Sequence, residues 1–378
     1  MHGKTNEMEI FSVSFVITMV YIGALSAVWT LSKYFGVFPL KLSKDSGKFV
    51  VSKRAQLFST VFLIMCYCID LLKMAQLFNL FIKSHFYLAT TLKVVANINC
   101  MLNFYFIFIV IKTHTMVLND LADICKQLKL KADFILNAEC IFVVIVCPML
   151  FNVYSALLFM SNDLDTFNKL KYTLFNMKAF TYACISSQFN CVIFLASAMF
   201  SKINQNIRKS TPIELDQLRF MVSNVFECCD IANGYFGVFI LMYIIHTSVH
   251  IQNNLFEAGK IICNLLLGQG SLENVTLSIW VRLITALACL LRLLSYVWCT
   301  TRLTLESNKM AALLVRVSNE VVCNSLKEQV YWFAEEVRWN KIGFTANGLF
   351  NIDRELLFMA AGSCATNMAI LLQAYISK

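Results

Sequence analysis

Long apolar runs limit what this chain can fold into. Seven of them are long enough to cross a membrane as a helix, at 57–82, 86–111, 134–160, 174–200, 234–256, 277–301 and 356–376. About 20 apolar residues in a helix span the ~30 Å hydrocarbon core of a bilayer. Only 15% of residues are charged and 58% are hydrophobic, against roughly 25% and 45–50% in soluble domains. The sequence therefore predicts an all-α integral membrane protein with seven transmembrane helices.

An eighth apolar run, 11–31, precedes these seven and is uncharged. It is a signal anchor, a further span, or a helix buried before the first crossing. A cleaved signal peptide is disfavoured, because the first ten residues carry more acid than base and the run is long. Transmembrane β-strands are excluded, because all of these runs are about twice too long and do not alternate. The fifteen cysteines are scattered through the chain without a Cys-x-x-Cys pair, so we expect them to act as small hydrophobic residues.

The distribution of Lys and Arg predicts the orientation, because cytoplasmic loops carry the excess. The segment before residue 57 and the loops 112–133, 201–233 and 302–355 hold 22 of the 32 Lys and Arg residues, and the opposite side holds 5. This places the N-terminal region in the cytoplasm and the C-terminus outside. The sequon at Asn274 falls in the predicted outer loop 257–276, in agreement. G-protein-coupled receptors have the reverse orientation.

The predicted organisation has four parts: a cytoplasmic region 1–56, six transmembrane helices within 57–301, a cytoplasmic segment 302–355, and a final helix 356–378. Within 302–355, apolar residues recur at spacings of three and four, which is typical of amphipathic helices. They are Met310, Leu313, Leu314, Val317, Val321, Leu326, Val330, Phe333 and Val337. This stripe must pack against neighbours in the same chain or against another subunit. We expect a turn near Gly343 and Gly348, and a cap on the final helix from Asn351 or Asp353.

The final helix carries a polar stripe on an otherwise apolar surface. At 100° per residue, one arc of about 120° holds Ser363, Thr366, Asn367, Ile370, Gln373 and Ser377. Polar groups are costly against lipid, so this arc is expected to face protein or water. It either forms hydrogen bonds between helices or lines a pore.

Residues 344–375 resemble the C-terminal signature of insect gustatory receptors. In that family, an aromatic-rich turn precedes a helix with Thr-Tyr, five hydrophobic residues and Gln-Phe. Thr366, the five-residue spacer and Gln373 match, whereas Asn367 stands in place of the Tyr and Ala374 in place of the Phe. Residues 33–40 also resemble the stretch that precedes the family's first span. The similarity covers the architecture of nearly the whole chain, but the detailed motif covers only residues 344–375.

The resemblance implies a ligand-gated, non-selective cation channel that detects small-molecule tastants in the plasma membrane of sensory neurons. It implies a homo- or hetero-tetramer of related receptors in membrane lipid, joined by a cytoplasmic anchor for which 302–355 is the candidate, with its apolar stripe at the subunit interface. The final helix would line the pore through Ser363, Thr366, Asn367, Ile370, Gln373 and Ala374. Ala374 puts the family's aromatic gate in doubt and leaves Ile370 to form the constriction by dewetting. No cofactor, metal or nucleic acid is implied.

The family's ligand pocket lies among spans two to six. Polar and aromatic residues in the outer halves of these spans are the candidates for it, namely Asn97, Asn152, Tyr154, Tyr182, His246 and Trp280. The surroundings are rich in Phe, Leu, Ile and Val, whereas a sugar requires a hydrogen bond for each hydroxyl that leaves water. The sequence therefore favours bitter or other apolar plant compounds over sugars.

Other functions are less well supported. His246 and His250 have an i, i+4 spacing, but no third metal ligand is evident. No GxSxG, HExxH or P-loop motif is present, so an enzyme is not expected. A secondary transporter is disfavoured by the odd number of spans, the few Gly and Pro residues and the lack of a repeat. A metabotropic seven-helix receptor is the other alternative.

Two arginines lie inside predicted spans. Arg282 is near an outer end, where a long side chain can reach the interface. Arg292 lies deeper and requires a partner, for which Asp70 and Glu139 are candidates.

Overall fold

The computed structural model describes residues 40–42, 48–61, 64–65, 68, 109–128, 130, 166–207, 212–266, 272–320 and 323–376. Its elements are β1 (Leu40–Leu42), β2 (Phe49–Val51), α4 (Ile111–Gln127), α7 (Thr166–Ile207), α8 (Pro212–Leu266), α9 (Leu272–Glu320), α10 (Asn324–Trp339) and α11 (Arg354–Ile376). The predicted helices at 174–200, 234–256, 277–301 and 356–376 are confirmed, within α7, α8, α9 and α11. Residues 11–31, 134–160 and most of 57–82 and 86–111 lie outside the described residues.

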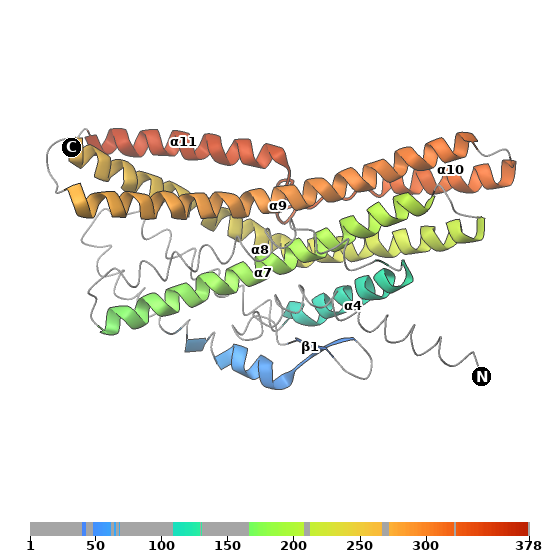
Figure 1. Ribbon diagram of the computed structural model, residues 1–378, viewed down its shortest axis with the longest axis horizontal. Coiled ribbons are helices and arrows are strands. Elements are labelled where there is room, and N and C mark those ends of the chain that lie inside the picture. The colour runs from blue at the N-terminus through green and yellow to red at the C-terminus, as the bar shows by residue number, and fades with distance from the viewer. Residues whose placement is uncertain are drawn as a thin grey trace.

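Three long helices, α7, α8 and α9, run along the longest dimension of the molecule (Figure 1). α11 lies beside the half of this bundle where α8 ends and α9 begins, and α10 lies beside the other half of α9 (Figure 1). We call these halves the C-terminal end and the α10 end. With 55 residues, α8 is about 80 Å long, more than twice the thickness of a hydrocarbon core. By length and composition, the described helices able to cross a membrane lie at Glu214–Leu265, Arg282–Glu320 and Arg354–Gln373.

The helices extend far beyond their apolar cores. The predicted outer loop 257–276 is wrong for most of its length, because α8 continues to Leu266 and α9 begins at Leu272. Asn274 of the sequon therefore lies in the first turn of α9. Hydropathy indicates where a helix leaves the lipid, but not where the helix ends. Once a helix has formed, each further residue is added at little cost in free energy. The predicted loops 112–133 and 201–233 are largely helical for the same reason, in α4, α7 and α8.

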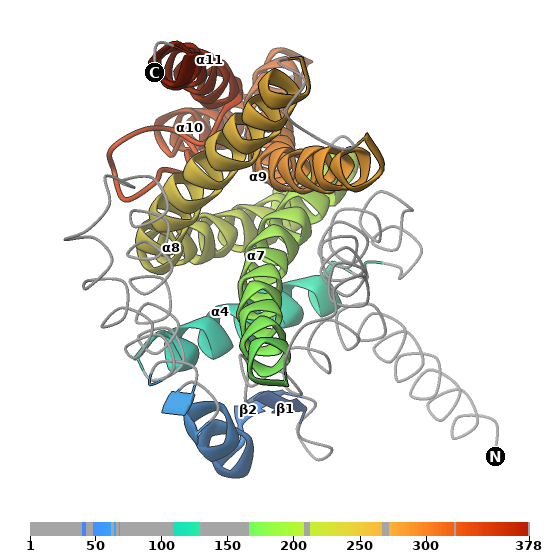
Figure 2. The ribbon, with the colours of Figure 1, turned by 90° about the vertical axis from the view of Figure 1, so that its left-hand side faces the viewer.

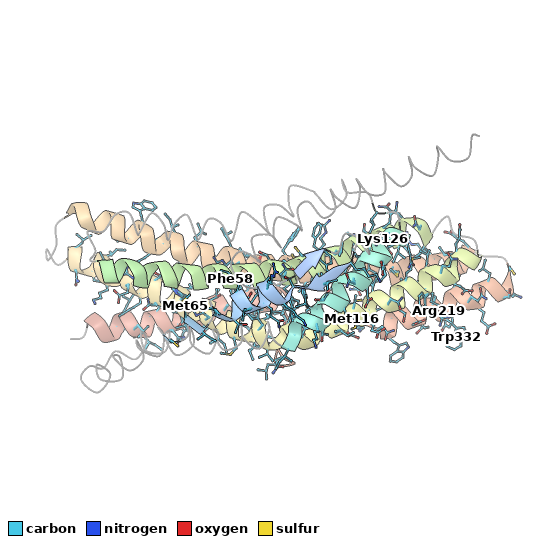
Figure 3. The ribbon with its side chains drawn as sticks, turned by 90° about the horizontal axis from the view of Figure 1, so that it is seen from below. Phe58, Met65, Met116, Lys126, Arg219 and Trp332 are labelled. Atoms are coloured by element: carbon cyan, nitrogen blue, oxygen red, sulfur yellow. The ribbon has the colours of Figure 1, made fainter. Side chains whose placement is uncertain are left out.

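The apolar stripe of 302–355 is buried within a single chain. α10 packs against α9, and the stripe joins the core through Met310, Leu314, Val330, Phe333 and Val337, all at most 3% exposed. These five residues of the stripe are therefore buried within one chain, whereas Leu313, Val317 and Leu326 are half-buried. The opposite side of α10 exposes other aromatic residues, Tyr331, Trp332 and Trp339. An ion pair of 2.6 Å between Arg219 Nε and Glu336 Oε2 joins α8 to α10. Figure 3 labels Arg219 and Trp332 at the α10 end.

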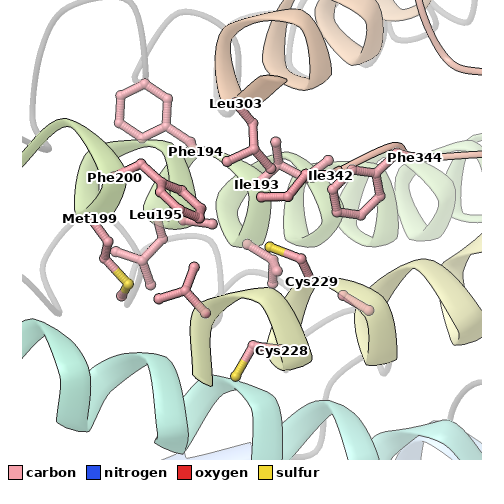
Figure 4. Close-up of a cluster of buried hydrophobic side chains, with 14 of the residues drawn as sticks. Ile193, Phe194, Leu195, Met199, Phe200, Cys228, Cys229, Leu303, Ile342 and Phe344 are labelled. Carbon is pink, nitrogen blue, oxygen red and sulfur yellow. The ribbon is translucent and has the colours of Figure 1, made fainter. Parts of the chain in front are cut away.

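A continuous apolar core fills the space where α7, α8 and α9 meet the segment that precedes α11 (Figure 4). Ile193 and Phe200 of α7, Leu303 of α9 and Phe344 are all at most 4% exposed. Cys229 of α8, 2% exposed, is part of the same core. Cys228 and Cys289 are likewise buried, as expected of small hydrophobic side chains, whereas Cys68 and Cys323 are exposed.

A short strand pair, which the sequence did not predict, lies against α4. β1 and β2 pair antiparallel, with Leu40 opposite Val51. The Asn119 side chain of α4 accepts a hydrogen bond from Phe49 N (2.8 Å) and donates one to Phe49 O (3.2 Å). Lys48 Nζ lies 3.1 Å from Asp123 Oδ2 of the same helix. One amide side chain therefore satisfies both backbone groups of a strand residue and holds β2 on α4. Figure 2 shows the strand pair on the same side of the molecule as α4.

Candidate functional site

The final helix, α11, has one packed face and one exposed face. The packed face includes Leu357, Ala360, Cys364 and Met368, which are half-buried at spacings of three and four. The predicted pore-lining residues lie on the exposed face, namely Ser363, Thr366, Asn367, Ile370 and Gln373; Ala374 is described only as a position in α11. Ile370 is 57% exposed. The structure therefore brings these five predicted residues together on the side of α11 that points away from the rest of its chain.

The hydrogen bonds of this stripe stay on α11 within the described part of the chain. Thr366 Oγ1 donates to Gly362 O at 3.0 Å, and Asn367 Nδ2 donates to Ser363 Oγ at 3.5 Å. Each of these bonds joins residues one turn apart. The stripe is thus not used to hold α11 against the described helices of the same chain.

The packed face of α11 rests on α8. At Gly259, an added Cβ would lie 3.0 Å from Leu372 Cδ2, so only glycine allows this approach without a shift of the leucine. Eight residues before Leu372, the Cys364 Sγ accepts a hydrogen bond from Gln252 Nε2 at 3.8 Å. Small residues let membrane helices pack closely. Gly259 was not predicted as a contact residue from the sequence, although a glycine late in an apolar helix is the available signal.

The segment 340–353 connects α10 to α11 through a tight reversal. Thr345 and Asn351 form an antiparallel bridge, and Asn347 and Gly348 between them have φ of +54° and +76°. Left-handed residues of this kind reverse the chain, and glycine adopts that conformation without strain. The predicted turn is therefore confirmed at Gly348. Asp353 caps α11, because its Oδ1 accepts hydrogen bonds from Glu355 N (2.9 Å) and from Leu356 N (3.4 Å).

Two neighbouring helices fasten this turn. Asn233 Oδ1 of α8 accepts a hydrogen bond from Thr345 N at 2.9 Å. Thr300 Oγ1 of α9 donates one to Ile352 O at 2.6 Å. At Gly237 of α8, an added Cβ would lie 3.0 Å from Asn347 N. The start of α11 is thus fixed to α8 and α9 through backbone atoms, which do not rotate away as side chains do.

A cluster of aromatic rings joins the same turn to three helices. Phe189 of α7 meets Phe236 of α8 and Tyr296 of α9 edge to face, with ring centroids 5.3 Å apart in both pairs. It meets Phe344 of the turn in the same way at 5.5 Å. Phe189, Phe236 and Tyr296 are fully buried. Phe189 therefore lies at the centre of the packing that positions α11.

A buried histidine of α4 contacts the part of α8 that packs against the turn. His114 Nδ1 lies 2.8 Å from the Tyr235 hydroxyl of α8. In the sequence, Tyr235 lies between Asn233 and Gly237, the two α8 residues that contact the turn. Burial lowers the pKa of His114 to about 3, because a low-dielectric environment disfavours the charged form. The imidazole is therefore neutral near pH 7, and this link between α4 and α8 does not change with physiological pH.

The predicted pocket residues are not assembled by the described part of the chain. Asn97, Asn152 and Tyr154 lie outside the described residues, and Tyr182 is described only as a position in α7. His246 is half-buried in α8, with its ring centroid 5.1 Å from that of His250. Trp280 of α9 is 63% exposed, and its place in the pocket stays a prediction. Among the described residues, no third His, Cys, Asp or Glu joins the two histidines.

The two arginines inside the spans have different environments. Arg282 of α9 does not simply reach for the interface, because its Nη2 lies 3.8 Å from Glu257 Oε2 of α8. This pair was not predicted, since Glu257 was expected in the loop 257–276. Arg292 is 6% exposed and lies beside Tyr243 and Tyr296. Its proposed partners Asp70 and Glu139 lie outside the described residues.

A bundle of long apolar helices that ends in an apolar helix with an exposed polar stripe is typical of multi-pass membrane receptors and channels. Residues 25–378 match the 7tm chemosensory receptor family. The chain belongs to this family of seven-helix, multi-pass membrane chemoreceptors, which are receptors and not enzymes.

One curated relative and two solved structures are similar to the chain. It is 31% identical over 152 residues to the putative gustatory receptor 28b of Drosophila melanogaster, a match that spans 39% of this chain and 31% of that relative. Its fold resembles that of the insect olfactory receptor OR5 from Machilis hrabei, alone and in complex with eugenol. Both structures have a TM-score of 0.65, sequence identities of 13% and 12%, and cover 94% of this chain and 99% of the other. The predicted family and the all-α seven-helix fold are thus confirmed, while the orientation stays a prediction.

Proposed function

We propose that this chain is a gustatory receptor that acts as a ligand-gated, non-selective cation channel for small-molecule tastants. The exposed polar stripe of α11 is the observation that carries the proposal. Ser363, Thr366, Asn367 and Gln373 are exposed in a single chain, whereas the opposite face of α11 packs on α8. Polar groups on a membrane helix face protein or water. A ring of subunits turns each stripe toward a common water-filled axis, and Ile370 then forms the apolar constriction.

We further propose a homo- or hetero-tetramer in the plasma membrane of sensory neurons, with a cytoplasmic N-terminus and an outer C-terminus. The bias of Lys and Arg supports this orientation. The α10 end then lies in the cytoplasm, where Tyr331, Trp332 and Trp339 are 52%, 58% and 82% exposed. Trp and Tyr are enriched at protein interfaces, so this side of α10 is the candidate subunit contact of the anchor.

The proposed tastants are bitter or other apolar plant compounds bound among spans two to six. The similar OR5 structure is described in complex with eugenol, a small organic molecule. Asn97, Asn152, Tyr154, Tyr182 and His246 stay candidates for this pocket. Trp280, which is exposed on α9, also stays a candidate.

Direct gating predicts currents in an excised outside-out membrane patch without nucleotides. If the open state binds ligand 100-fold more tightly, each site contributes about 2.7 kcal/mol and four sites contribute about 11 kcal/mol. Tastants from a compound screen should therefore open unitary currents promptly. Silence that GTP or cytosol reverses would support a metabotropic receptor, and slow saturable flux without unitary events would support a transporter.

Cysteine substitution tests the pore-lining face. Ile370→Cys and Gln373→Cys should react with a charged thiol reagent added outside and block the current, because both positions are exposed. Leu371→Cys and Leu372→Cys, on the half-buried face, should react at least about tenfold more slowly. The parent protein, which contains the half-buried Cys364, sets the background rate. Faster reaction at the two leucine positions would show that another face of α11 lines the pore.

A further inference from the structure

At the C-terminal end of the bundle, α8 lies between α9 and α11. Figures 1 and 2 show the last part of α8 between the start of α9 and the end of α11. Glu257 of α8 pairs with Arg282 of α9, and Gly259 of α8 contacts Leu372 of α11. Residues two apart on a helix are separated by about 200°. This short stretch of α8 therefore contacts α9 on one side and α11 on the other.

The ion pair lies in partly buried surroundings. The side chains of Arg282 and Glu257 are 29% and 21% exposed, and their closest atoms are 3.8 Å apart. Charge interactions are stronger in such surroundings than in water, and loss of one partner leaves the other charge partly desolvated. The pair therefore favours one position of α9 relative to α8.

The same stretch of α8 is next to the predicted constriction. The Leu372 side chain meets Gly259, and the following residue, Gln373, is exposed on the polar face. Glycine has no side chain, so the Leu372 side chain packs directly against the backbone of α8. A displacement of α8 at Glu257 therefore moves Leu372 and, with it, Gln373.

We propose that the Arg282–Glu257 ion pair is a positioning contact that couples the movement of α9 to the outer end of the pore-lining helix. The proposal rests on the function proposed above, because it assigns α11 to the pore. Neither residue touches the permeating ion. The pair sets the position of α8 between α9, which belongs to the ligand-binding spans, and Leu372 of α11.

Charge reversal and charge exchange test this coupling without a known tastant. The probe is the trimethylammonium-ethyl methanethiosulfonate reagent, and its reaction rate with Gln373→Cys is measured on intact cells by labelling of surface protein. Glu257→Arg and Arg282→Glu should each change this rate by at least about fivefold. The double variant that carries both substitutions should return the rate to within about twofold of the parent, because a positive charge on α8 then attracts a negative charge on α9.

Matched controls separate positioning from folding. Arg316→Glu makes the same charge change on an exposed part of α9 and should leave the rate unchanged. Arg282→Lys keeps the charge and should stay near the parent, whereas Arg282→Gln should behave like the reversal. These two variants test the proposal if a reversed variant fails to reach the surface.

Unchanged rates in the single variants, or a double exchange that does not restore the rate, would overturn the coupling proposal. The rate is read from labelled protein and not from current. A receptor that shows the coupling but passes no current would instead overturn the proposed channel function.

Discussion

Replacing Phe189 by alanine is expected to lower the free energy of unfolding by about 3–5 kcal/mol. Phe189 is fully buried and forms edge-to-face contacts with Phe236, Tyr296 and Phe344. Each aromatic pair adds roughly 0.5–1.5 kcal/mol beyond the burial of its area. Because a whole domain is stable by only about 5–15 kcal/mol, most of the variant should be lost from the cell surface.

The measurement is the unfolding temperature of detergent-purified receptor, together with the fraction at the surface. Phe189→Leu keeps most of the volume and should cost less than about 1.5 kcal/mol. Phe220→Ala on α8, where the ring is 65% exposed, is the matched control and should change stability by less than about 0.5 kcal/mol. A Phe189→Ala variant as stable as the Phe220→Ala variant would show that the aromatic cluster does not hold the turn.

Gly237→Ala is expected to disturb the base of the final helix. The added Cβ would lie 3.0 Å from Asn347 N and 3.2 Å from Asn347 Cα, which are backbone atoms of a turn fastened to α8 and α9. Overpacking of this kind costs about 1–3 kcal/mol, partly offset by about 1 kcal/mol from the higher helix propensity of alanine. The net result is a loss of up to about 2 kcal/mol and an altered open probability, because the turn sets the start of α11.

Gly234→Ala on the same helix is the matched control. An added Cβ there has no atom within 4 Å, so this variant should gain about 0.5–1 kcal/mol and keep normal currents. Thermal unfolding and single-channel recording of the two variants give the comparison. If Gly237→Ala is as stable and conducts as well as Gly234→Ala, the turn is not held rigidly against α8.

The sequence predicted those features that depend on residues close together in the chain. Hydropathy identified α7, α8, α9 and α11, because the transfer of each side chain into lipid contributes independently of its tertiary neighbours. The cap at Asp353 was predicted as one of two candidates, because a capping side chain reaches only two or three residues ahead. The spacing of Val330, Phe333 and Val337 predicted a buried stripe for the same reason.

Other features could not be predicted, because they depend on which segments become neighbours. The sequence placed Glu257 in a loop and did not pair it with Arg282. It gave no reason to single out Gly237 or Phe189, whose importance comes from the turn at 344–352. The strand pair β1–β2 was also missed, since Phe49 of β2 is held by Asn119, 70 residues further along the chain.

By itself, the sequence determined that the chain crosses a membrane and that one arc of its last helix is polar. Only the tertiary structure decided that this arc points away from the chain, because Gly259 of α8 allows Leu372 on the opposite face to pack closely. The physical reason is that hydropathy is a property of single residues and is visible along the chain. A packed face, in contrast, is defined by pairs of residues that only the fold brings into contact.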